Sequence, residues 1–205
     1  MAQPALPLPA PPELQQDSIV VLRNATWADF QRVLELKGDS SVPRVAYLEG
    51  VLELMSPSQT HEAAKSMIGC LVEAWCIEKG VDITPYGSWT HEDKESQRGI
   101  EPDECYVLGD SAEPKRCDLA IEIIWTSGSI DKLEIYRKLR VREVWFWKRG
   151  AISVHELDGE RYRAIAASQL LAGIDLAELL EFVDIRPMTR AVREYRARLA
   201  ARAAR

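Results

Sequence analysis

Two helices near the N-terminus are predicted from capping residues and from apolar positions that recur every three or four residues. The first begins after Thr26, an N-cap residue followed three positions later by Asp29, and ends at Gly38. The second takes Ser56 as its N-cap and ends at Gly80. Its apolar positions share one face and are Ala64, Met67, Ile68, Leu71, Val72 and Trp75. We therefore expect the second helix to pack one side against the core.

Short segments rich in β-branched and aromatic residues, separated by turns, are typical of strands. They cover residues 44–48, 51–55, 83–86, 104–108, 118–124, 143–148, 151–156 and 162–166. Glu49-Gly50 and Arg149-Gly150 each stand between two of these segments, so two β-hairpins are predicted.

The C-terminal half adds three predicted helices. The first is capped by Ser127 or Ser129 and runs to Leu139, and two more cover residues 175–182 and 189–205. Because helices alternate with strands and no internal repeat occurs, the pattern favours an α/β or α+β fold with helices packed against a sheet.

Length and composition indicate one ordinary globular domain. The chain has 205 residues, of which 46% are hydrophobic and 28% charged, and this balance excludes collagen-like and low-complexity proteins. We expect a disordered Pro-rich tail over residues 1–16, a folded domain over residues 17–186 and a basic C-terminal helix over residues 187–205.

Neither a membrane segment nor a secretion signal is predicted. The apolar runs fall far short of the roughly 18 residues that a membrane helix needs, and the N-terminus lacks the charged and apolar regions of a signal peptide. We therefore expect a cytoplasmic protein that contacts no membrane.

Cysteines and histidines give no metal-binding motif in the sequence. No CxxC pair occurs, so we expect free core thiols at Cys70, Cys76, Cys105 and Cys117. We expect partly exposed or surface histidines at His61, His91 and His155. Three scattered histidines do not favour a zinc site.

Charge is distributed unevenly along the chain. The net charge is −6, but residues 186–205 hold seven arginines and one acid, so this end carries +6 and the remainder −12. An acidic body excludes non-specific coating of nucleic acid as the sole function. Acidic groups gathered in one cleft would need a cation between them and any phosphate.

A carboxylate stands in the middle of the most apolar predicted strand. On a period of two, Glu122 shares one face with Asp118 and Ala120. The opposite face carries Cys117, Leu119, Ile121 and Ile123. Since burying an unpaired carboxylate costs several kcal/mol, the fold must supply a counter-charge, a proton or a metal at Glu122.

Two further charged residues are candidates for the same site. Lys132 lies on the helix after this strand and shares a face with Ile135, Tyr136 and Leu139, so its side chain points partly inward. Asp103 stands at the start of the preceding strand. Two carboxylates beside one ammonium suit a hard divalent cation and metal-assisted hydrolysis of a phosphodiester.

Structural interpretations of the same residues stay open. A Glu–Lys pair between a strand and its following helix is equally well explained as a structural ion pair, and the third group favours function. Glu101 and Asp118 lie near strand ends, where a solvated acid needs no partner. The Arg-rich C-terminal helix is either a solvated face or the one strongly basic patch for a phosphate backbone.

Five segments together resemble the Uma2 family of endonucleases, which belongs to the PD-(D/E)XK, restriction-endonuclease-like superfamily. The likeness extends from Trp27 to Leu157, and His61 accompanies the first segment. The segments are Tyr47–Ser58, Glu101–Asp103, Asp118–Glu122, Lys132–Tyr136 and Val141–Trp147.

The resemblance implies a restriction-endonuclease-like mixed central sheet flanked by helices with an added β-hairpin, and Mg²⁺-dependent hydrolysis of DNA, with Mn²⁺ as an alternative ion. Asp103 and Glu122 match the two acidic motif positions and would ligate the metal with the Ile123 carbonyl. The usual motif lysine falls at Ile124, which cannot serve, and Lys132 fits the position of a lysine relocated to the next helix.

The match is incomplete in three respects. The segment Trp125–Gly128 departs from the family's Ser-Pro-Ser-Thr, and the link to Lys132 is shorter by about one helical turn. Val51 replaces an acid, so any role of that acid would pass to Glu49 or Glu53.

The resemblance makes Glu62 or His61 an outer contributor to the site.

Three functions are therefore compared. The first is an endonuclease in which Asp103 and Glu122 hold Mg²⁺ and Lys132 positions the attacking water. The second is a catalytically inactive module that binds DNA or a protein through the Arg-rich end, and the third is a hydrolase of small phosphate esters. A homodimer is expected if both strands of a duplex are cut.

Overall fold

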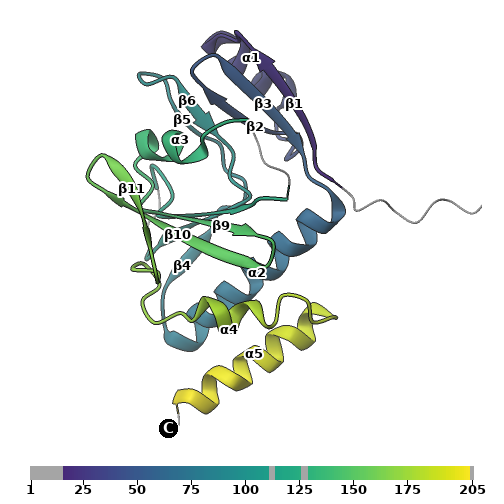
Figure 1. The fold of residues 1–205 in the computed structure, drawn as a ribbon, viewed down its shortest axis with the longest axis vertical. Coiled ribbons are helices and arrows are strands. Elements are labelled where there is room, and N and C mark those ends of the chain that lie inside the picture. The colour runs from purple at the N-terminus through teal and green to yellow at the C-terminus, as the bar shows by residue number, and fades with distance from the viewer. Residues whose placement is uncertain (1–15, 111–113, 126–128, 204–205) are drawn as a thin grey trace, which may run out of the picture.

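The computed structural model describes residues 16–110, 114–125 and 129–203. The expected tail over residues 1–16, apart from its last residue, lies outside this part of the chain, as do the proposed cap Ser127 and the end of the C-terminal helix. Two sheets and five helices make up the described fold, which is a mixed α/β structure (Figure 1).

The first sheet is antiparallel and has the strand order β1-β3-β2-β6-β5. Its strands are β1 (Ser18–Arg23), β2 (Arg44–Leu48), β3 (Val51–Ser56), β5 (His91–Asp93) and β6 (Arg98–Ile100). Helix α1 (Trp27–Lys37) lies on this sheet and buries Phe30 against it. One of the two predicted hairpins is β2 and β3, and three further strands extend it into this sheet.

The second sheet is the central one, with the strand order β11-β10-β9-β8-β7-β4. Its strands are β4 (Ile83–Pro85), β7 (Glu104–Leu108), β8 (Leu119–Ile123), β9 (Glu143–Lys148), β10 (Ala151–Asp158) and β11 (Arg161–Ile165). β8 and β9 are parallel, joined through helix α3 (Lys132–Leu139), and the other pairs are antiparallel. The predicted mixed central sheet is confirmed.

Helices cover both faces of the central sheet. On one face, α2 (Gln59–Lys79), α4 (Leu176–Leu180) and α5 (Met188–Ala203) enclose a large apolar core that includes Ile121, Trp145 and Leu71. α3 covers the other face with a smaller cluster that includes Ala120 and Tyr136 (Figure 1). The two faces of β8 therefore belong to two different cores.

Two predicted helix caps are wrong. The N-cap of α2 is Ser58, whose hydroxyl accepts from the His61 backbone N–H, because Ser56 still belongs to β3. The N-cap of α3 is Asp131 instead of Ser129. In both cases the chain continues for two more residues before the helix begins.

Other sequence expectations also need correction. His61 and His91 are buried, with 0% and 4% of their surfaces exposed, instead of lying near the surface. Cys117 packs in the α3-side cluster, because it precedes β8 and strand alternation does not extend to it. Strands β1, β5 and β6 were not predicted, and the last two have only three residues each.

Gly99 marks the closest packing between α1 and the first sheet. A Cβ atom placed on Gly99 would lie 2.2 Å from Cζ of Phe30, far inside van der Waals contact. Phe30 is fully buried, so its ring has no free space to move into.

We predict that Gly99→Ala lowers the free energy of unfolding by about 1–3 kcal/mol, because the added methyl overpacks this contact. Urea unfolding of the variant measures the loss. In a Phe30→Leu background the same substitution should cost less, since the clashing ring is gone. Equal penalties in the two backgrounds would show that Phe30 is not the cause.

Candidate active site

Glu122 lies on the α3 side of β8, as the alternation predicts. Its neighbours in the strand, Ile121 and Ile123, face the opposite core. The Glu122 carboxylate is fully buried, and it accepts hydrogen bonds from Lys132 Nζ at 2.5 Å and from the Tyr136 hydroxyl. The buried acid therefore has the counter-charge that the sequence requires.

The start of α3 explains why two of its residues reach Glu122. Asp131 caps the helix, which makes Lys132 its first residue. Lys132 and Tyr136 are four residues apart and so lie on one helical face, one turn above the other. The Lys132 side chain is only 16% exposed, and Tyr136 is fully buried.

Asp103 immediately precedes β7 and is fully buried. Its Oδ1 contacts the Arg44 guanidinium and lies 3.0 Å from His61 Nε2. Its Oδ2 accepts from the backbone N–H of Ile123 at 2.6 Å. Asp103 is thus tied to the residue that follows Glu122 in β8.

The geometry of β8 also places the Ile123 carbonyl. The N–H and C=O of one strand residue point to the same edge of the strand, and successive residues alternate between edges. Because the Ile123 N–H reaches Asp103 while the Ile124 N–H donates to Trp147 on β9, the Ile123 carbonyl points to the Asp103 edge. Two predicted ligand groups, Asp103 and Ile123, therefore share one edge of β8.

The charges of the three predicted site residues are coupled. Burial, reinforced by the Asp103 charge, raises the pKa of Glu122 in spite of Lys132 and Tyr136. Burial alone would raise the pKa of Asp103, but His61, Lys132 and Arg44 lower it to about 2. Burial opposes the charge on Lys132, but Glu122 and Asp103 outweigh it and raise the pKa of this lysine. Lys132 is therefore protonated at neutral pH.

Residues from the first sheet and from α2 hold Asp103 from the other side. Arg44, at the start of β2, is buried and also pairs with Glu62 at 2.6 Å. His61 lies between Asp103 and Asp17, whose Oδ2 is 2.9 Å from Nδ1. Burial would lower the pKa of His61, but the two carboxylates outweigh it and raise this pKa.

Sequence reasoning missed Arg44 and Asp17 and assigned no function to Tyr136. Arg44 opens a strand whose next three residues are buried, and this cation in an apolar setting was the available signal.

Glu53 is also buried, and it accepts from the backbone N–H and the hydroxyl of Ser129 at 2.8 and 3.0 Å. It thus holds the segment that leads into α3.

The donor set suits a hard divalent cation. Carboxylate and carbonyl oxygens are the ligands that Mg²⁺ and Mn²⁺ prefer. Ion pairs and one further electrostatic interaction link the site to neighbouring charged groups. The linked acids are Asp17, Glu53, Glu62, Asp103 and Glu122, and the linked bases are Arg44, His61, Lys65 and Lys132. The acids outnumber the positive charges by one when His61 is protonated and by two when it is neutral. The residues present therefore fit a divalent cation.

A cavity of about 390 Å³ lies at the start of α3, and Glu122 itself is not among the residues that line it. Phe146 of β9, the register partner of Glu122, lines it together with Lys132. Its other polar lining groups are Asp131, Lys148, Ser153 and His155.

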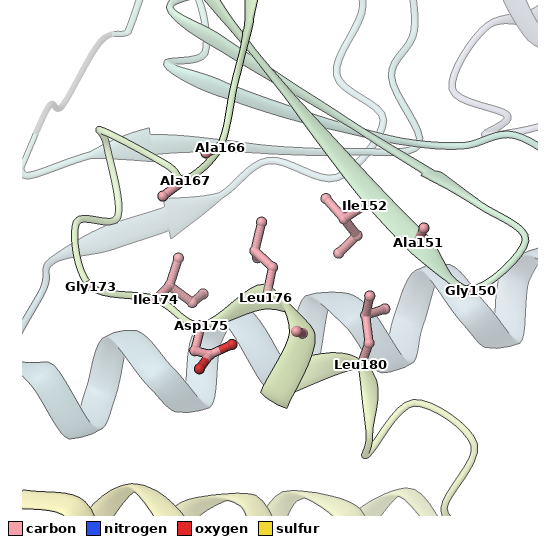
Figure 2. A pocket seen from close by; sticks show the side chains of 11 residues that line it. Gly150, Ala151, Ile152, Ala166, Ala167, Gly173, Ile174, Asp175, Leu176 and Leu180 are labelled. Carbon is pink, nitrogen blue, oxygen red and sulfur yellow. The ribbon is translucent and has the colours of Figure 1, made fainter.

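A larger cavity of about 750 Å³ lies between α4 and the β9–β10 turn, and Figure 2 shows that its lining is mostly apolar. Its one acid, Asp175, caps α4.

The two ambiguous acids have structural partners. Glu101 pairs with Lys37 at 2.5 Å and accepts from the Val45 backbone N–H. Asp118 accepts from the Leu108 backbone N–H across the β7–β8 pair. Both carboxylates therefore stabilise the fold without reaching Glu122 through any contact among the described residues.

The basic C-terminal helix is packed onto the domain. Ala191, Tyr195 and Leu199 of α5 are buried in the core that α2 shares. Four of its five arginines form ion pairs with acids of this chain: Arg190–Glu194, Arg196–Glu78, Arg198–Glu181 and Arg202–Glu178. These pairs offset much of the positive charge that the sequence concentrates there.

Every helix in the described ranges is too short or too polar to span a lipid bilayer.

A family model described as "Uma2: Putative restriction endonuclease" matches residues 27–189. One similar solved structure is described as a "putative nuclease belonging to DUF820 from Anabaena variabilis", with 13% identity and a TM-score of 0.48. The match covers 76% of this chain and 98% of that chain. No curated protein matches.

We predict that Lys132→Met destabilises the protein by about 3–5 kcal/mol at pH 8, because it leaves a buried carboxylate without its cation. The loss should be smaller at pH 5. Glu122 already has a folded-state pKa above that of an unfolded glutamate, and removing Lys132 raises it further. The contribution of the Glu122 carboxyl to the free energy of unfolding is therefore present at low pH and is lost as pH rises through the folded-state pKa of Glu122.

Urea unfolding in EDTA at the two pH values measures this effect. The double variant Glu122→Gln with Lys132→Met should recover most of the stability and lose the added pH dependence, since no charge is then buried. A loss below about 1 kcal/mol at both pH values would show that the pair is not held in a dry site.

Proposed function

Because the chain belongs to the Uma2 family of restriction-endonuclease-like proteins, we propose that it is a Mg²⁺-dependent endonuclease that hydrolyses phosphodiester bonds in DNA. The observation that carries this proposal is the convergence of two buried carboxylates, Asp103 and Glu122, with one ammonium, Lys132. Mn²⁺ satisfies the same oxygen donors.

In this proposal each group has a separate task. Asp103, Glu122 and the Ile123 carbonyl hold the ion, which when bound polarises the phosphate and offsets the charge that develops on it. Lys132 stays protonated, because both carboxylates raise its pKa. It therefore orients the attacking water or a phosphate oxygen as a hydrogen-bond donor and does not remove a proton.

The remaining contacts preorganise these groups. Tyr136 donates to the Glu122 oxygen that Lys132 does not contact, which fixes the carboxylate plane. His61 and Arg44 fix Asp103. A simple structural ion pair needs one cation for one acid, whereas the linked groups here have an excess of acids. This excess favours a site that receives a cation.

The cavity at the start of α3, which Lys132 lines, is the proposed position of the DNA backbone. Lys148 lines it two residues beyond Phe146 on the same strand face, and Ser153 and His155 add hydrogen-bonding groups from β10. Lysine ammonium groups bind phosphate as point charges. The homodimer expected from the sequence stays a prediction.

The alternative is a catalytically inactive module that binds DNA or protein. Its expected contact surface is the basic end of the chain, but the α5 arginines pair with Glu78, Glu178 and Glu181. Hydrolysis of small phosphate esters stays open as a third candidate, and comparing rates on a nucleotide ester and on DNA separates it from the first.

We predict that the protein nicks supercoiled plasmid in Mg²⁺ or Mn²⁺ and that EDTA abolishes the activity. Glu122→Gln and Lys132→Met should each lower the rate by about 100-fold or more, since each removes a group that acts on the developing charge. Agarose-gel nicking assays measure the rates, and circular dichroism confirms that the variants fold.

The matched control for this assay is Glu104→Gln. Glu104 is the residue after Asp103, but its side chain lies near Gly69 of α2, and burial raises its pKa, so the neutral amide is tolerated. This variant should keep the activity. Equal nicking by the control and by Glu122→Gln would reject the catalytic assignment and favour the inactive module.

We further predict that Lys148→Gln raises KM for DNA by about 3–10-fold with kcat little changed, because one phosphate contact is lost. The slope of log affinity against log salt should fall by about 1. Lys79→Gln at the exposed end of α2 is the control and should change neither value. A lower kcat with unchanged KM would place Lys148 elsewhere in the mechanism.

A further inference from the structure

Three metal-ligating side chains that the proposed carboxylate site does not include meet under α3. A ring nitrogen of His91 and the Sγ atoms of Cys105 and Cys117 all lie within 4.8 Å of one another. The exposed fractions of these residues are 4%, 0% and 0%. His91 Nε2 is 3.8 Å from Cys105 Sγ, and both cysteines are free thiols.

These ligands come from both sheets. His91 lies on β5 of the first sheet, Cys105 on β7 of the central sheet, and Cys117 just before β8. The three residues are separated by 14 and 12 positions in the chain, so no short sequence motif announces them. The proposed nuclease chemistry uses none of them.

We propose that His91, Cys105 and Cys117 form a binding site for Zn²⁺ or another soft divalent metal ion. Two thiolates and one imidazole provide three of the four ligands of a tetrahedral zinc centre. The two thiolates also neutralise the charge of the ion, so binding buries no net charge.

The observed spacing is close to that of a filled site. Zn–S bonds of about 2.3 Å and Zn–N bonds of about 2.0 Å place tetrahedral ligands about 3.5–3.8 Å apart. The His91–Cys105 distance of 3.8 Å is about 0.3 Å longer than the nitrogen–sulfur value. Because no pair of ligand atoms is more than 4.8 Å apart, each pair needs to approach by about 1.3 Å at most. Side-chain rotation supplies a movement of this size.

One of the three ligand residues borders a cavity of about 260 Å³, which leaves room for a fourth ligand. His91 lines it, and so does Arg116, the neighbour of Cys117. Its other charged lining groups are Glu92, Asp93, Lys115 and Lys138. A water molecule in this cavity would complete the tetrahedron.

A metal here would act on the proposed active site through the backbone. Cys105 stands two residues after Asp103, and Cys117 precedes the strand that carries Glu122. Cys117 also packs in the same cluster as Tyr136, the hydrogen-bond donor to Glu122. The ion would join the two sheets where both supply residues to the carboxylate site.

Cobalt titration of the full-length protein, kept reduced and in excess Mg²⁺, tests this proposal. One equivalent of Co²⁺ should give the thiolate-to-cobalt charge-transfer band and the visible bands of a tetrahedral centre. Oxygen ligands at Asp103 and Glu122 produce no such charge-transfer band, so the two sites are distinguished. Zn²⁺ at about 100 times its Kd should raise Tm by about 5–10 °C.

Variants assign the signal to residues. Cys117→Ser and His91→Gln should lose the Co²⁺ spectrum and the Zn²⁺ shift in Tm. Cys70→Ser, at a half-buried thiol outside the cluster, should keep both, and so should Glu122→Gln, whether or not the nuclease assignment holds. A spectrum that persists in Cys117→Ser would overturn the assignment.

X-ray absorption of the Zn²⁺-loaded wild-type protein keeps the test decisive if a variant does not fold. Two sulfur neighbours at about 2.3 Å and nitrogen at about 2.0 Å are expected. A shell of oxygen and nitrogen alone, or no thiolate band in the reduced wild-type protein, would reject the site.

Discussion

The cost of burying Glu122 in the middle of β8 governs the arrangement of this molecule. A carboxylate removed from water requires a cation or a proton, and the strand itself supplies neither. The counter-charge comes from Lys132, the first residue of α3, and its position depends on the cap at Asp131. The crossover between the parallel strands β8 and β9 must therefore bring the start of α3 over Glu122. One electrostatic requirement thus determines where the helix lies on the central sheet.

A second acid extends this requirement to the rest of the fold. The charge of Asp103 is compensated by Arg44 from the first sheet and by His61 from α2. The burial of Asp103 therefore requires both the first sheet and α2 to be in place. Such networks are seldom a net source of stability, because apolar residues of the same volume would avoid the desolvation cost. The energetic argument therefore favours a functional reason for keeping these charges. It agrees with the excess of acids over cations, which a structural network would not need.

Local patterns predicted what depends on a few neighbouring residues. Alternation along β8 placed Glu122 in the core, and helical spacing placed Lys132 on the inward face of α3. The caps of α2 and α3 were misplaced by two residues, because two residues that can cap a helix stand close together before each one. Arg44 and Asp103 are 59 residues apart, and their pairing depends on how two sheets dock, which no local period encodes. For the same reason His61 and His91 were expected near the surface.

The cluster of His91, Cys105 and Cys117 and the carboxylate site would select different metal ions, because their ligand atoms differ in chemistry. Oxygen donors at Asp103, Glu122 and Ile123 suit hard ions that keep several waters, whereas Cys105 and Cys117 favour soft ions that give up their waters for thiolates. Both sets lie along β7 and β8 on the α3 side of the central sheet. A soft ion held between β5 and β7 would restrain the strand segment next to Asp103. Since positioning errors of about 1 Å are costly in catalysis, such a restraint would bear on the rate as well as on stability.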